Sequence, residues 1–275
     1  MGLPELRFAQ IPHRSRGRYD GDRFSYMEAG PAAAPPVVLL HGIGSNSTGW
    51  RHQYAALSDR FRLVGWNAPG YMLSDNLRAD PPGRRDYADA LDDFLAALGV
   101  ERFDLLANSF GTRIAQDFAH FHTDRILRAV FTGTSVAVER PAEERARMVE
   151  ARAAQVAAGG YGFGARAPAL LGSQASPETF AAVQQVLRAT NPKGFMQAVR
   201  FGASASAPPI GAGLTMPLMM IQGADDRVTP LAANAARLAE SVPRAQIVML
   251  EGCGHLPELE APAQVNQLVR EFLSA

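Results

Sequence analysis

A serine, a pair of aspartates and a histidine each follow a short apolar run where the sequence predicts a strand to end. They are Ser109 after the run from Asp104, Asp225 and Asp226 after residues 217–222, and His255 after residues 246–250. A serine hydroxyl is a weak nucleophile near neutral pH unless a base takes its proton and a third group orients that base. Loops at the carboxyl ends of strands meet at one edge of a parallel sheet. The pattern therefore predicts a site for nucleophilic catalysis.

Ser109 stands between a predicted strand and a predicted helix that runs to about His120. A serine in such a turn has its hydroxyl pushed out from the backbone. Strand and helix pass closely there, so the positions two before and two after must be small, as Ala107 and Gly111 are. The amide of Phe110 would lie unpaired at the helix N-terminus and could face a developing oxyanion. The alternative is that Asn-Ser only caps the helix.

The alternation of strand and helix patterns predicts a mostly parallel sheet with helices on both faces, the α/β class. Residues 37–40 form a continuous apolar run, typical of a strand buried on both sides, and lead into His-Gly-Ile-Gly. Backbone amides of that loop could face a ligand, or the loop could be an ordinary strand-to-helix turn. Nearer the N-terminus, residues 3–30 predict a strand pair, with a hairpin turn signal at Asp20 and Gly21.

The alternation stops in residues 136–214, where helical runs at 140–158, 177–189 and 192–203 follow one another. Strand patterns resume at residue 217. We therefore expect residues 1–135 and 215–275 to form an α/β core and residues 136–214 to form an inserted helical lid.

Composition restricts the partners. Lys plus Arg and Asp plus Glu both number 27, so the net charge favours neither nucleic acid nor an anionic membrane. Cys253 is the single cysteine, which excludes an intrachain disulfide and a cysteine metal cluster. No residues have metal-ligand spacing, and no cofactor is expected. The sequence has no hydrophobic signal region, so we expect a cytoplasmic protein with a small-molecule substrate. A homodimer stays open.

Taken together, these motifs carry a family resemblance. The order Ser, Asp, His at three strand ends, with His-Gly-x-Gly, Asn-Ser-Phe-Gly and Gly-x-x-Asp, resembles lid-bearing serine hydrolases of the α/β-hydrolase fold. Esterases, enol-lactonases and C–C bond hydrolases of aromatic breakdown share this layout. The resemblance implies Ser109 as nucleophile, His255 as general base and Asp226 as the acid. It implies an oxyanion hole made by the amides of Ile43 and Phe110.

Asp225 is the nearest rival to Asp226 for the acid and is interpreted as a turn residue. Four residues depart from the family pattern at positions that are structural in the family; they are Asn67, Met72, Ala107 and Thr112. We expect them to affect loop geometry rather than the three catalytic residues.

Five residues are candidates for contact with the substrate. His41 would brace the oxyanion loop, and the four others could bind a substrate carboxylate or simply lie exposed on helices; they are Arg140, Arg166, Asn191 and Arg200.

The predicted function is hydrolysis of a small carboxylic ester or lactone through an acyl-enzyme. One alternative is a C–C hydrolase that cleaves a vinylogous 1,5-diketone, although His255 lacks the aromatic residue that often follows it in such enzymes. A second alternative is a ligand-sensing protein with negligible turnover, because fold alone does not settle function.

Overall fold

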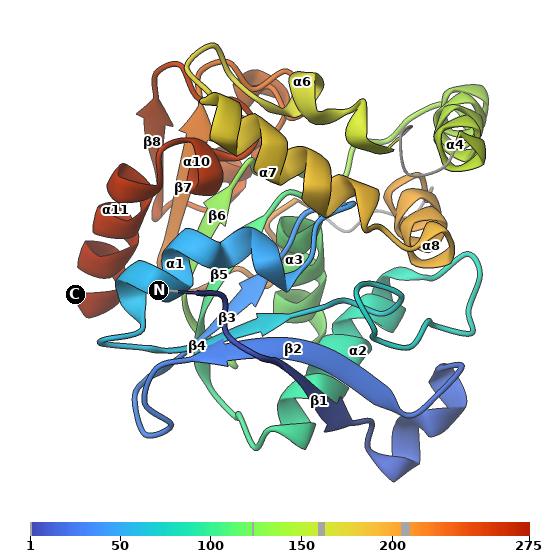
Figure 1. Cartoon of the computed structure of the whole chain (residues 1–275), viewed down its shortest axis with the longest axis horizontal. Coiled ribbons are helices and arrows are strands. Elements are labelled where there is room, and N and C mark those ends of the chain that lie inside the picture. The colour runs from blue at the N-terminus through green and yellow to red at the C-terminus, as the bar shows by residue number, and fades with distance from the viewer. Residues whose placement is uncertain (1, 123, 159–162, 205–209) are drawn as a thin grey trace.

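An eight-stranded sheet forms the centre of the protein, with strand order β1-β2-β4-β3-β5-β6-β7-β8 (Figure 1). The computed structural model describes residues 2–122, 124–158, 163–204 and 210–275. The strands are β1 Leu6–Gln10, β2 Arg23–Ala29, β3 Pro36–Leu40, β4 Arg62–Trp66, β5 Phe103–Asn108, β6 Ile126–Thr132, β7 Leu218–Gly223 and β8 Ala245–Leu250. The β1–β2 and β2–β4 pairs are antiparallel, and every other pair is parallel. The predicted fold class is confirmed.

The apolar runs of the central strands serve both faces of the sheet. Side chains alternate along a strand, so an uninterrupted apolar run supplies two cores at once. In β3, Val38 and Leu40 join the core on one face, whereas Val37 and Leu39 join the core on the other. This division explains why the strand needs apolar residues at every position.

Helices cover both faces. One face carries α2 (Arg84–Ala97), α3 (Phe110–Phe121) and α9 (Ala235–Ser241), whose buried side chains belong to the larger core cluster. The opposite face carries α1 (Arg51–Leu57) and α11 (Pro262–Ser274), which contact each other and share the second cluster. A short helix, α10 (Pro257–Glu260), follows the turn after β8.

Where the structure describes the chain between β6 and β7, it forms helices joined by loops and no strand. It contains α4 (Ala142–Ala157), α6 (Ala167–Leu170), α7 (Pro177–Arg188) and α8 (Pro192–Gly202). Apolar side chains of α6, α7 and α8 form a cluster of their own with Leu256 and Leu259, which follow β8. In Figure 1, α6 and α7 lie across the end of the sheet where β6 and β7 terminate. The division into a core and a separate lid stays a prediction.

The connection between β1 and β2 differs from the expected hairpin. The strands do pair antiparallel, but Gln10 pairs with Arg23, so a long loop joins them. That loop contains a 3-10 helix, His13–Arg18, whose C-terminal cap is Tyr19. Tyr19 donates a hydrogen bond to Asp93 of α2 at 2.9 Å. The predicted strand pair is confirmed, and Asp20 and Gly21 lie in a bend just before β2, at the end of a longer loop than a two-residue hairpin turn.

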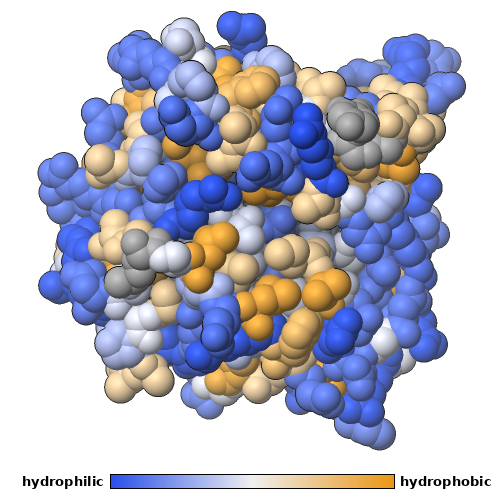
Figure 2. All heavy atoms as spheres, viewed as in Figure 1, coloured by the Kyte–Doolittle hydropathy of each residue, from blue (hydrophilic) through white to orange (hydrophobic). Residues whose placement is uncertain are grey.

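The surface is mixed in character. Hydrophilic side chains cover most of the face in Figure 2, and hydrophobic ones gather in a smaller area near its middle. Phe8 is 49% exposed, and the guanidinium of Arg23 lies 4.8 Å from its ring centroid. In the part of the chain that the structure describes, no helix is both long and apolar enough to cross a membrane.

The contact of α3 with β3 can be tested through Gly111. A Cβ added there would lie 2.3 Å from the carbonyl oxygen of Leu40. We expect Gly111→Ala to lower the free energy of unfolding by about 1–3 kcal/mol, because backbone must move to relieve the overlap. Urea denaturation measures the change. Gly202→Ala is the control, since nothing lies within 4 Å of its added methyl group. Equal midpoints for the two variants would contradict the close contact.

Candidate active site

Ser109 occupies the sharp turn between β5 and α3. Its backbone angles are φ 49 and ψ −109, a conformation that residues other than glycine rarely adopt. The amide of Ser109 donates to the carbonyl of Thr132 in the neighbouring strand at 3.1 Å, which holds the turn in place. Ala107 is fully buried, and Gly111 has no room for a side chain, as the sequence predicted for a turn of this kind.

Close contacts join this turn to the loops around it. The side-chain amide of Asn108 donates to the carbonyl oxygen of His255 at 3.1 Å. A Cβ on Gly42 would lie 2.4 Å from Asn108 Oδ1, and one on Gly133 would lie 2.6 Å from the carbonyl oxygen of His255. The loops after β3, β5, β6 and β8 therefore meet at Ser109.

The structure brings His255 and Asp226 together. His255 Nδ1 lies 2.9 Å from Asp226 Oδ2, and both side chains are almost wholly buried. The same carboxylate oxygen accepts from the Thr229 hydroxyl at 2.7 Å, and Oδ1 accepts from the amides of Val228 and Thr229. Burial would raise the pKa of Asp226, but the hydrogen bonds and the charge of His255 outweigh it and hold that pKa below its usual range.

Asp225, the rival carboxylate, points elsewhere. Its Oδ2 accepts from the amide and the hydroxyl of Ser173, at 2.8 and 2.6 Å. These hydrogen bonds lower its pKa. Asp225 thus links the loop after β7 to the helical segment, and Asp226 is the one that meets the imidazole.

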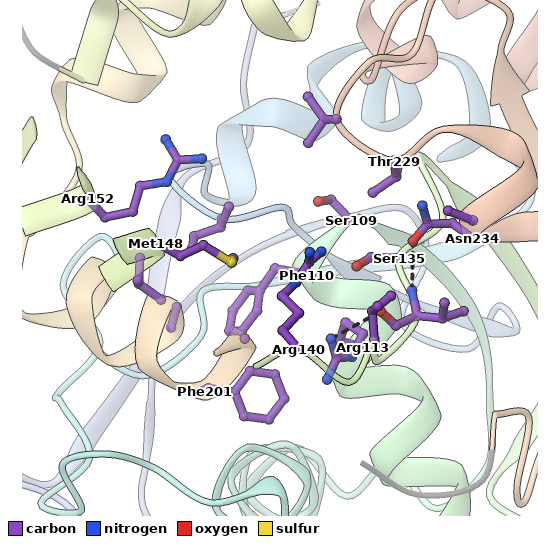
Figure 3. Close-up of a pocket in the computed structure, with 18 of the residues that line it drawn as sticks. Ser109, Phe110, Arg113, Ser135, Arg140, Met148, Arg152, Phe201, Thr229 and Asn234 are labelled. Atoms are coloured by element: carbon purple, nitrogen blue, oxygen red, sulfur yellow. Dashed lines mark hydrogen bonds between the residues drawn. The ribbon is translucent and has the colours of Figure 1, made fainter. Parts of the chain in front are cut away.

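Two cavities meet at Ser109. The larger has a volume of about 380 Å³ and is lined by Ile43, Phe110 and residues of α4 and α8. The smaller, of about 40 Å³, is lined by His255, Glu258 and apolar side chains of α7. Figure 3 shows the hydroxyl of Ser109 directed into the larger cavity. A substrate could therefore place one part in each cavity with its reacting bond at Ser109.

The two amides named for the oxyanion hole lie beside this junction. Phe110 is the first residue of α3, where a backbone N–H has no partner within the helix. Ile43 lines both cavities together with Ser109. The arrangement places both residues next to the hydroxyl, and their role as donors remains a proposal.

The structure accommodates the residues that depart from the family pattern. Buried Asn67 accepts from the amide of Ser47 at 2.7 Å through its side chain. Thr112 donates its hydroxyl to the carbonyl of Ser109 at 2.6 Å, which ties the first turn of α3 to the elbow. Met72 has a φ of 47, so the chain takes a glycine-like conformation there without glycine.

Of the five candidate substrate contacts, Arg140 and Arg166 line the larger cavity. The other three are placed elsewhere. His41 accepts at Nε2 from the amide of Ala68, and burial lowers its pKa to about 4, so it is neutral and braces the loop. Asn191 caps α8 by accepting from the amide of Lys193, and Arg200 pairs with Asp80 at 2.7 Å.

Sequence reasoning missed several residues of the site. Thr229 bonds the acid, Glu258 lines the smaller cavity, and Arg113 and Arg152 line the larger one. Thr229 and Glu258 each stand three positions after a named residue, Asp226 and His255, which is the signal that could have found them. In the described ranges, no three His, Cys, Asp or Glu side chains converge as metal ligands would.

Comparisons with known proteins identify the family and the fold. The sequence pattern of the alpha/beta hydrolase fold matches residues 35–262. A 2-hydroxymuconate semialdehyde hydrolase of Pseudomonas sp. strain CF600 is 29% identical over 262 residues, which is 87% of each chain. An esterase structure from Thermogutta terrifontis has a TM-score of 0.81 at 23% identity and covers 98% of each chain. An enol-lactonase structure from Burkholderia xenovorans has a TM-score of 0.75 at 21% identity and covers 94% of this chain and 98% of its own.

Glu258 generates a prediction about pH. It is 4% exposed, and its Oε2 has no hydrogen-bond partner among the described residues. Burial raises its pKa to about 8, helped by the charges of Glu260 and Asp226. Between about pH 4.5 and 8 the unfolded state has therefore lost a proton that the folded state keeps, and this carboxyl makes stability fall as pH rises.

Glu258→Gln removes that proton equilibrium. We expect the free energy of unfolding of the Gln variant, relative to the wild type, to rise steadily from about pH 5 to about pH 8. Urea denaturation of both proteins across this range measures the difference, in which the titration of all other groups cancels. A difference that stays constant with pH would contradict the raised pKa.

Proposed function

Since the chain belongs to the alpha/beta hydrolase fold family and is a hydrolase, we propose that it cleaves a small carboxylic ester or lactone through an acyl-enzyme formed on Ser109. The observation that carries the proposal is the hydrogen bond between His255 and Asp226 beside a strained, cavity-facing serine. A histidine oriented by a carboxylate and placed with a serine is the arrangement that activates a hydroxyl.

In the proposed mechanism, Ser109 attacks the carbonyl carbon of the substrate. With Nδ1 bonded to Asp226, the imidazole of His255 has Nε2 free to take the serine proton and later to give it to the leaving group. Asp226 fixes the tautomer and stabilises the imidazolium, and its lowered pKa keeps it ionised throughout. The amides of Ile43 and Phe110 stabilise the tetrahedral oxyanion. Water then attacks the acyl-enzyme and regenerates the hydroxyl.

A C–C hydrolase is the second candidate, because a relative of nearly equal length is named 2-hydroxymuconate semialdehyde hydrolase. Loss of the visible absorbance of a yellow dienol substrate, with no turnover of esters or lactones, would favour it. A ligand-sensing protein remains the third candidate, and tight binding without product release would favour that role.

The nucleophile is tested by labelling with a fluorophosphonate probe. We expect stoichiometric modification of the wild type at Ser109, because the probe reacts with a serine that a base activates. Ser109→Ala should lose labelling and the hydrolysis of an activated aryl ester. Cys253→Ala is the control: this thiol is buried, and its pKa is raised to about 11, so labelling should persist. A labelled Ser109→Ala protein would refute the proposal.

The identity of the catalytic acid is tested by replacing each of the two neighbouring aspartates in turn. Asp226→Asn should lower kcat for the aryl ester by on the order of 10³–10⁴-fold, because the imidazole loses its orientation and its counter-charge. Asp225→Asn should leave kcat within about twofold, since its side chain bonds Ser173 instead. Steady-state kinetics measure both. The reverse result would move the acid to Asp225.

A further inference from the structure

The wall of the larger cavity is strongly cationic. Four arginines line it together with Ser109: Arg113, Arg140, Arg152 and Arg166. Among the described residues, no aspartate or glutamate lines this cavity. The chain as a whole has no net charge, so this local excess is not a consequence of composition. Charges of one sign in a cleft raise the local concentration of the opposite ion.

Two of these arginines have partners that account for their positions. Arg140, just before α4, forms an ion pair at 2.6 Å with Glu144 in the first turn of that helix. Arg113 donates to the carbonyl of Val136 at 3.3 Å, and its guanidinium lies over the ring of Phe201. The charge of Asp117 also stabilises the Arg113 cation.

Within the described residues, the other two arginines have no anionic partner. Arg166 is 8% exposed, and its Nη1 has no hydrogen-bond partner within the described chain. Its guanidinium lies 5.8 Å from the ring centroid of Phe195. Arg152 donates to the neutral side-chain amide of Gln155 at 2.9 Å and to no carboxylate in the described part of the chain.

The two unpaired cations also repel each other. Burial lowers the pKa of Arg166, and the charge of Arg152 lowers it further, to about 10. Arg166 is therefore still charged near neutral pH, although partly desolvated. An uncompensated buried charge is destabilising, and an anion bound beside both arginines would relieve the desolvation and the repulsion together.

We propose that Arg152 and Arg166 bind a carboxylate of the substrate while its ester bond lies at Ser109. Guanidinium groups bind carboxylates through paired N–H donors. In Figure 3, Arg152 lies across the cavity from Ser109, with Met148 and Phe110 between them. Apolar side chains therefore line the space that a short carbon chain would occupy. The proposal rests on the proposed ester hydrolysis and adds its substrate class, a half-ester of a dicarboxylic acid.

The test compares matched substrates that differ only in charge. Mono-4-nitrophenyl esters of succinate, glutarate and adipate are assayed beside the same compounds with the free carboxylate methylated. For at least one chain length, kcat/KM of the wild type should be higher for the carboxylate by about ten- to hundredfold, the effect expected of hydrogen bonds to a charged group. Equal values at every length would overturn the proposal while leaving ester hydrolysis intact.

Variants assign the preference to the two residues. Arg166→Met and Arg152→Met should each lower kcat/KM for the preferred carboxylate at least about tenfold and leave the methylated ester within about threefold. Arg147→Met is the matched control, because Arg147 is exposed on the same helix as Arg152 and lines neither cavity. A loss that is equal for both substrates would show a structural role and overturn the proposal.

A binding measurement tests the carboxylate site independently of the proposed reaction. The dianions succinate, glutarate and adipate are titrated by calorimetry into Ser109→Ala, which needs no catalysis. We expect saturable binding of at least one, lost in the double variants Ser109→Ala with Arg166→Met and with Arg152→Met. Binding without hydrolysis of any ester would support the carboxylate site and reject the ester reaction. Absence of binding by all three would reject the site.

Discussion

The close contact of β3, β5 and α3 around one serine is the constraint on which the site depends. Gly111 lies against the backbone of Leu40, and Gly42 lies against Asn108, with no space for a Cβ at either position. This packing maintains a backbone conformation at Ser109 that costs about 1–3 kcal/mol elsewhere in proteins. The packing of the surrounding elements offsets that cost, and Ser109 is held where the two cavities meet.

Charge is distributed unequally around that hydroxyl. The negative charge of Asp226 is stabilised by hydrogen bonds from Val228 and Thr229, and one of its oxygens contacts the imidazole of His255. Glu258, in the smaller cavity, has a pKa raised to about 8, so near neutral pH it is mostly protonated and adds little negative charge beside His255. The larger cavity carries the arginines. Arg166 lines both cavities, and the other three arginines line only the larger one, so a substrate meets the stronger positive charge in the larger cavity.

Much of this could be predicted from the sequence, because the information was local. Apolar runs defined the strands, and the polar residues after three of them included Ser109, Asp226 and His255. Loops and long side chains were less predictable. The loop after β1 contacts α2 through the hydrogen bond from Tyr19 to Asp93, and Arg200 pairs with Asp80 instead of lining the cavity. Such contacts join residues far apart in the chain, and no periodic pattern records them.

Sequence by itself determined the order of strands along the chain, the residue types at their ends and the small residues that the elbow requires. These follow from side-chain periodicity and from steric limits that act within a few residues. Only the tertiary structure decided which arginines line the cavity unpaired, that Thr229 supports the acid and that Glu258 is buried beside His255. The partners and the burial of a side chain are properties of the folded protein. They depend on which distant segments pack against that side chain and exclude water from it.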